Sequence, residues 1–188
     1  DTYAYSVSKR LPASGNTPEV GAFTQDLTVE PRLSVNVDII DGLALRASVG
    51  RYGRVAQSED RSAQFGNPNL PRARATQALM TVAIQPIEEL QLELTAFASL
   101  QSSLAMRSTA EPAQLAGALA ATGDGRVFGG QAMLRAQLPH GVFGWVSYTL
   151  SRAQRRAAPD QAWRLFDYDQ THVATAVLGW TAPFGLEL

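Results

Sequence analysis

Strict alternation of apolar and other residues constrains this sequence more than any other feature. In residues 33–39 every odd-numbered residue is aliphatic and every even-numbered residue is polar, and in residues 43–49 the odd-numbered positions are again apolar. Successive side chains of a β-strand point to opposite faces of the sheet, so this period of two predicts strands. Asp41-Gly42 lies between the two segments and favours a tight turn, because glycine tolerates a positive φ. The two segments therefore predict a β-hairpin.

The same alternation recurs along the chain, and its connections alternate in length. Further strands are expected at residues 79–84, 90–97, 128–138, 142–151 and 171–180, and an earlier one within residues 2–8. Short turns are expected near 40–42, 85–89, 139–141 and 183–185, and long polar connections at about 9–26, 54–72, 106–124 and 154–168. Tight turns at one end of an antiparallel sheet and long loops at the other are typical of a transmembrane β-barrel. We therefore predict an all-β fold, an antiparallel transmembrane barrel segment of about eight or nine strands out of roughly 22.

The two faces of the predicted strands differ in chemistry. The apolar face is mainly Leu, Val, Ile and Ala, whereas the opposite face carries amide and charged side chains that a packed core would leave unpaired. Aromatic residues near strand ends, namely Tyr52, Phe128, Trp145 and Trp180, are interpreted as interfacial girdles. We expect lipid contact at Val35, Val37, Leu45, Val49, Leu92 and Leu94, and a lumenal position for Asn36, Asp38, Arg46 and Glu93.

Composition excludes several classes of function. The 188 residues carry 16 basic and 17 acidic side chains, a net charge of -1, which gives no basic surface for nucleic acid. The absence of cysteine excludes disulfides, thiolate metal sites and a cysteine nucleophile within this sequence. No apolar run approaches the roughly 18 residues of a transmembrane helix. Because the sequence begins without an initiator Met or signal peptide and stops in mid-pattern, we expect an internal piece of a longer protein, which on its own would form an open, curved sheet.

Two polar motifs are weighed as candidate chemical sites. Residues 167–172, Asp-Tyr-Asp-Gln-Thr-His, contain metal-ligand types, but strand geometry places His172 opposite Asp167 and Asp169, so we interpret them as capping groups at a strand entry. The glycines of residues 123–129 have neither the spacing nor the strand-then-helix context of a nucleotide loop, and are interpreted as structural. No nucleophile and base can be placed together on one face. No enzyme, metal or cofactor is therefore expected.

Several segments, taken in order, resemble the barrel of a TonB-dependent outer-membrane receptor, most like those of myxobacterial or related origin. The runs that carry the resemblance are Pro-Arg-Leu-Ser at 31–34, residues 45–52, Phe-Gly-Asn-Pro-Asn-Leu at 65–70 followed by Arg-Ala-Thr at 74–76, residues 143–152 and residues 163–172. The chain departs from the family at Pro71-Arg72-Ala73, where Lys-Pro-Glu is usual. The plug domain and TonB box lie outside this segment.

The resemblance implies a receptor that takes up a scarce nutrient, such as a ferric siderophore or cobalamin, across the outer membrane of a Gram-negative bacterium. Its partners would be its own plug domain, TonB through that plug, outer-membrane lipid and a small nutrient ligand. Loops on a rigid scaffold carry function, so the long loops at 54–72 and 154–168 would contact ligand through Arg61, Arg155, Arg156 and Trp163. The alternative that stays open is a soluble β-barrel or lectin-like module that binds a small molecule or glycan.

Overall fold

The chain folds almost entirely into β-strands. The structure, a computed structural model, describes residues 2–11, 20–62, 65–108 and 117–181. Its single helical element in that part of the chain is the 3-10 turn η1 (Pro139–Gly141). The strands are β1 (Thr2–Leu11), β2 (Val20–Leu27), β3 (Arg32–Ile40), β4 (Leu43–Arg54), β5 (Ala73–Ile87), β6 (Leu90–Arg107), β7 (Leu119–Leu138), β8 (Val142–Arg156), β9 (Arg164–Leu165) and β10 (His172–Trp180).

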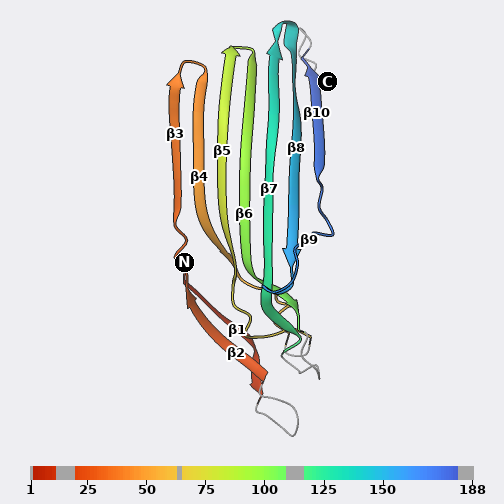
Figure 1. Ribbon diagram of the computed structural model, residues 1–188. Coiled ribbons are helices and arrows are strands. Elements are labelled where there is room, and N and C mark those ends of the chain that lie inside the picture. Colours follow the sequence, from red (N-terminus) through yellow and green to blue (C-terminus); the bar gives the residue numbers. More distant parts are fainter. Residues whose placement is uncertain (1, 12–19, 63–64, 109–116, 182–188) are drawn as a thin grey trace.

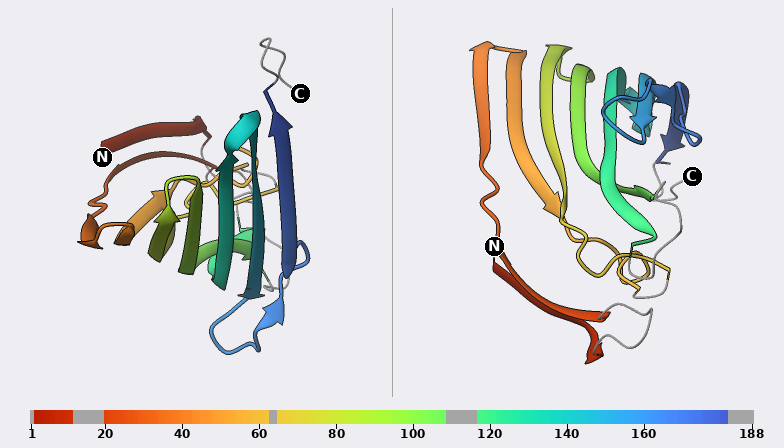
Figure 2. Two further views of the ribbon diagram at one scale, coloured as in Figure 1. Left: turned by 90° about the horizontal axis from the view of Figure 1, so that it is seen from above. Right: turned by 60° about the horizontal axis from the view of Figure 1, so that its bottom comes forward.

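Eight strands form one antiparallel sheet in the order β10-β8-β7-β6-β5-β4-β3, with the short β9 also paired to β8. Tight turns join β3 to β4, β5 to β6 and β7 to β8 at one end of the sheet, and the long connections lie at the other end (Figure 1). The sheet is twisted and curved, and within the described residues its edge strands β3 and β10 are not paired with each other (Figure 2). The all-β, antiparallel and open architecture is therefore confirmed. The turn predicted at 183–185 lies outside the described residues.

The register assigns every strand residue of the sheet to one of two faces. Val35, Ala47, Met80 and Ala96 are cross-strand partners in one row, and the neighbouring row on the same face joins Val37 to Leu45, Val82 and Leu94; we call this side the apolar face. The opposite side, the polar face, includes a row formed by Asn36, Arg46, Thr81, Thr95, Gln131 and Thr149. The predicted division of these strands into two chemically different faces is confirmed.

The sheet has almost no hydrophobic core. Among the described residues the buried apolar side chains are Leu70 and Ala83, at 3% and 7% exposure, and Pro68. The side chains of the apolar face remain in the open, with Val35 at 49%, Val37 at 46% and Leu94 at 44% exposure. An apolar surface of this extent is far larger than the patches of a few hundred Å² that soluble monomers carry.

The two central strands continue beyond the rest of the sheet as a ribbon. β6 has 18 residues and β7 has 20, so together they shorten the connection predicted at 106–124. Two bulges interrupt the ribbon, one between Gln101 and Leu104 and one between Leu104 and Met106. Ser103 lies in the first bulge with a φ of 58°, a left-handed conformation that bulges commonly use. Cross-strand pairing thus extends strand structure into residues that show no alternation.

Three sequence predictions need correction. The connection predicted at 9–26 contains β2, which pairs with β1 in a separate two-stranded sheet. The described strands therefore number ten rather than eight or nine, because β2 and β9 lie in segments predicted as loops. Of the four girdle aromatics, only Phe128 and Trp180 share the apolar face, since register places Tyr52 and Trp145 on the polar face.

Candidate functional site

Hydrogen bonds link polar side chains of neighbouring strands across the polar face. The Glu93 carboxylate accepts from Arg46 Nη1 at 3.3 Å and from Gln91 Nε2 at 3.0 Å. One row along, the Thr81 and Thr95 hydroxyls lie 2.9 Å apart, and Thr81 is only 7% exposed. These pairs satisfy the polar groups of the face. Arg46 keeps a side-chain exposure of 50%, so it still meets water, whereas Thr81 is buried between its neighbours.

A hollow of about 480 Å³ lies on the sheet at its long-loop end. Tyr52 and Arg54 of β4, Gln101 of β6 and Arg155 of β8 reach it from the strands, and Asp60 reaches it from the long connection between β4 and β5. Its lining mixes polar and apolar groups, which suits a small ligand that is held by a few directional contacts. Of the four residues predicted to contact ligand, Arg155 lines this hollow.

The described part of the connection between β4 and β5 lies as a compact cap beside the hollow. Asn67 donates its backbone N–H to Asp60 O at 2.7 Å, within the loop. Its side-chain amide donates to Leu119 O at 2.9 Å, which ties the loop to the start of β7. Leu70 packs inside this loop at 3% exposure, and Arg61 is buried with it at 5% exposure. Arg61 is therefore part of the loop's interior rather than a ligand-facing side chain.

The adjacent residues Arg155 and Arg156 have different surroundings because they alternate across β8. The Arg155 guanidinium lies 4.0 Å from the Phe166 ring centroid, and Arg155 pairs in register with Arg164 of β9. Arg156 instead forms an ion pair with Asp124, at 2.7 Å from Nη2 to Oδ2, and donates to Pro159 O at 2.8 Å. Two guanidinium groups predicted to act together are thus separated by the sheet.

Trp163 accompanies Arg156, away from Arg155. Two guanidinium groups lie over the Trp163 ring, that of Arg126 at 4.3 Å and that of Arg156 at 4.8 Å from its centroid. Asp124 and Arg126 alternate with Phe128 along β7, so this cluster belongs to the end of the apolar face nearest the long loops. Trp163 therefore holds the loop after β8 against that face. The four predicted residues do not converge on one site.

The motif at residues 167–172 has the predicted capping role. Asp169 accepts from Ala153 N through Oδ1 and from the Thr171 hydroxyl through Oδ2, both at 2.6 Å, and so joins the loop to β8. The hydrogen bonds from Thr171 and Ala153 hold the pKa of Asp169 below its usual range. His172 Nδ1 lies 2.7 Å from the Tyr148 hydroxyl. In the part of the chain that the structure describes, no three His, Asp or Glu side chains gather as metal ligands would.

The hollow also contains residues that sequence reasoning missed. Arg54, Asp60 and Gln101 line it, yet none belongs to a motif. Strand register brings Arg54 and Gln101 to this end of the sheet, and the fold of the loop brings Asp60 there. Arg54 ends β4 on the same face as Tyr52, which is the one signal that alternation could have supplied.

The sequence matches no model of a known protein family, and no curated protein matches it significantly. Among the described residues, no helix has the length and hydropathy that crossing a lipid bilayer requires.

Proposed function

We propose that these residues form part of the wall of an outer-membrane β-barrel, in a receptor that takes up a scarce nutrient by the TonB-dependent route. The observation that carries the proposal is the apolar face, which is continuous, exposed and backed by no core among the described residues. In water such a face favours aggregation, whereas in a bilayer it is the surface that lipid solvates.

The positions of the tight turns support a tilted, membrane-crossing sheet. Val35, Met80 and Gly130 share one register row, yet they precede the turn residues Asp41, Glu88 and His140 by 6, 8 and 10 positions. The distance from this row to the turn therefore grows by about one residue with each successive strand. If all of them lie in one plane, a rise of about 3.3 Å per residue and a strand spacing of about 4.8 Å give a tilt of about 35°, within the 35–45° range of outer-membrane barrels.

The height of the apolar face fits a bilayer at that tilt. On β6 the residues of this face run from Leu90 to Leu100, with Leu92, Leu94, Ala96 and Ala98 between them. This segment is about 33 Å long at 3.3 Å per residue, or about 27 Å high at a tilt of 35°, close to the apolar band of about 25 Å that barrels present to lipid.

The polar face and the loop-end hollow supply the receptor part of the proposal. Arg54 and Arg155 offer guanidinium groups to an anionic nutrient, and Tyr52 offers an aromatic ring. The resemblance points to a ferric siderophore or cobalamin as the class of ligand. The plug domain and the TonB contact would be supplied by other parts of the protein.

Single cysteines test the membrane placement, because the 188 residues contain none. Val146 and Ser147 are neighbours on β8 that face opposite sides of the sheet. In outer membranes that contain the full-length protein, with any other cysteine replaced, we expect a water-soluble maleimide to label Ser147→Cys and to label Val146→Cys only after detergent. Equal labelling of both, with the protein in the soluble fraction, would favour the soluble binding module.

A further inference from the structure

Arginines mark the border of the apolar face at its long-loop end. The register row beyond Val49 contains Arg51, Thr76, Leu100 and Arg126. The rows beside it add further cations on the same face. The arginine border, as we call this group, consists of Arg51, Arg74, Arg126, Arg152 and Arg156.

The arginines of the border differ in their partners. Arg156 is paired with Asp124, Arg126 donates to Gln154 Oε1 at 2.8 Å, and both contact the Trp163 ring. Arg51 and Arg74 are exposed, and no side chain in the described residues pairs with either of them.

The carboxylate of Glu30, which lies beside Gly53, has other partners. Glu30 accepts from Arg32 at 3.0 Å and from Gly53 N at 2.7 Å. Arg51 and Arg74 are diagonal neighbours on adjacent strands, since Arg51 pairs with Thr76 and Gly53 pairs with Arg74. Diagonal neighbours lie about 7–8 Å apart, so both guanidinium groups can reach one anion.

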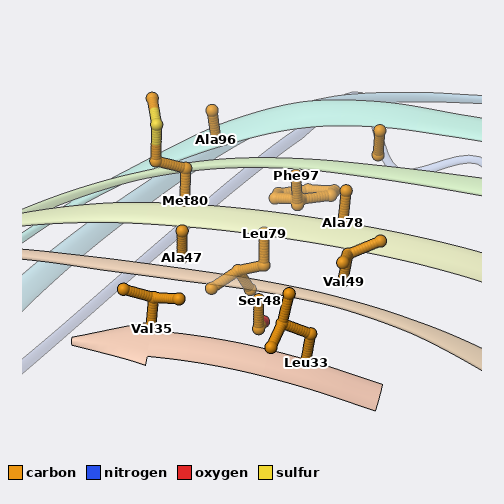
Figure 3. Close-up of a pocket in the computed structure, with 11 residues that line it drawn as sticks. Leu33, Val35, Ala47, Ser48, Val49, Ala78, Leu79, Met80, Ala96 and Phe97 are labelled. Carbon is orange, nitrogen blue, oxygen red and sulfur yellow. The ribbon is translucent and has the colours of Figure 1, made fainter. Parts of the chain in front are cut away.

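An apolar hollow of about 410 Å³ lies on the same face, next to Arg51 along the strand. Small side chains form its floor and larger ones stand around it, as Figure 3 shows for Leu33, Val35 and Met80. Val49 lines the hollow and lies two residues from Arg51, which is about 7 Å along the strand. The floor consists of four alanines on three adjacent strands, Ala47, Ala78, Ala96 and Ala98.

We propose that this part of the apolar face is a binding site for an anionic phospholipid, with the phosphate on Arg51 and Arg74 and an acyl chain in the alanine-floored hollow. The inference rests on the proposed function, because the face must meet a membrane. Guanidinium groups bind phosphate strongly, and a basic cluster at a membrane surface contributes about 1 kcal/mol per cation toward an anionic headgroup. An unpaired cationic pair directly beside an apolar hollow fits a molecule that has both an anionic head and a chain.

Native mass spectrometry of the full-length protein in non-ionic detergent tests the site. The probes are dioleoyl phosphatidylglycerol, which is anionic, and dioleoyl phosphatidylcholine, which carries the same chains and no net charge. We expect the protein to prefer the anionic lipid by about thirtyfold, which is the effect of two cations at about 1 kcal/mol each. The double variant Arg51→Gln/Arg74→Gln should lose this preference.

Matched variants separate charge from location. Arg54→Gln/Arg135→Gln removes two cations from the polar face and should leave the lipid preference unchanged. Ala78→Leu/Ala98→Leu fills the hollow and should weaken the binding of both lipids. Equal affinity of the unaltered protein for the two lipids, an unchanged preference in Arg51→Gln/Arg74→Gln, or unchanged binding after the hollow is filled would each overturn the proposal.

The same preparations distinguish failure of this site from failure of the proposed function. Migration on a denaturing gel before and after heating reports whether each protein has inserted as a barrel. A protein that inserts and shows no lipid preference refutes the lipid site alone. A protein that never inserts and stays soluble refutes the proposed function.

Discussion

Two arginine substitutions on opposite faces of one strand test whether the apolar face contacts lipid or water, because only a face in lipid makes the two variants differ in stability. Gln131 and Ala132 are neighbours on β7, and register places Gln131 on the polar face and Ala132 on the apolar face. The apolar positions of β7 extend from Phe128 to Leu138, so Ala132 lies near their middle. Replacing Ala132 removes almost no apolar side chain, and the comparison therefore isolates the cost of the cation.

The expected difference follows from that depth. An arginine that faces lipid at the bilayer midplane costs about 2–4 kcal/mol. At about 1.4 kcal/mol per factor of ten, Ala132→Arg lowers the folding equilibrium constant by about thirtyfold or more. Gln131→Arg stays on the hydrated polar face, and we expect its free energy of unfolding to change by less than about 0.5 kcal/mol, as surface substitutions usually do.

Urea titration of the full-length protein folded into phospholipid vesicles measures both free energies. The folded fraction is read from the gel mobility of unheated samples, and each variant is compared with the unaltered protein. If the two variants agree within about 0.5 kcal/mol, the size of an ordinary surface effect, then the apolar face does not contact lipid and the membrane placement is wrong.

Three other results are expected. In cells that express the full-length protein, Arg155→Ala should reduce nutrient uptake by about tenfold or more, which is the effect of one charge-assisted hydrogen bond. Arg156→Ala should lower loop stability and leave uptake close to normal. Similar uptake in the two variants would show that Arg155 does not belong to the ligand site. Because hydrogen bonds lower the pKa of Asp169, the contribution of its carboxylate to stability is present at neutral pH and is lost as the pH falls through that lowered pKa. Hydrogen exchange of residues 157–168 should therefore accelerate on acidification, and Asp169→Asn should show fast exchange already at neutral pH; a variant with normal protection would contradict the capping role. Residues 1–188 expressed alone should give no monodisperse monomer in size-exclusion chromatography without detergent, because in the part of the chain that the structure describes the apolar face and both edges of the large sheet are open. A monomer that unfolds cooperatively would favour the soluble module.

Alternation predicted the sheet well because each face has one kind of surroundings. In residues 33–39 the alternation assigns each side chain to one face, and β3 extends this segment by one residue at either end. β2 escaped prediction because its alternation is weak, and among the described residues it pairs with β1 alone. The outer halves of β6 and β7 escaped because a glycine-rich ribbon is specified by cross-strand pairing rather than by hydropathy.

The candidate site was less predictable than the sheet. Loop position suggested Arg155, which lines the hollow. It also grouped Arg155 with Arg61, Arg156 and Trp163, although Arg61 is buried and the other two belong to the other face. Composition and loop length carry no information about which way a side chain points once a strand extends into a loop. β8 does extend, to Arg156, and its alternation then decides which arginine can meet a ligand.

The two bulges of the β6–β7 ribbon have an evolutionary consequence. From Gln101 to Leu104 the chain of β6 advances three residues while β7 advances from Gly125 to Gly123, and from there to Met106 the imbalance is reversed. The extra residue on one strand is thus offset by an extra residue on its partner, so the original pairing register returns. The alternation of the ribbon is nevertheless shifted, because the even-numbered Leu104 and Met106 lie on the same face as Gly123, which is the polar face. A lone insertion here would turn the rest of the ribbon inside out. Homologous ribbons should accordingly differ in length by pairs of residues, or by single insertions that occur together on both strands.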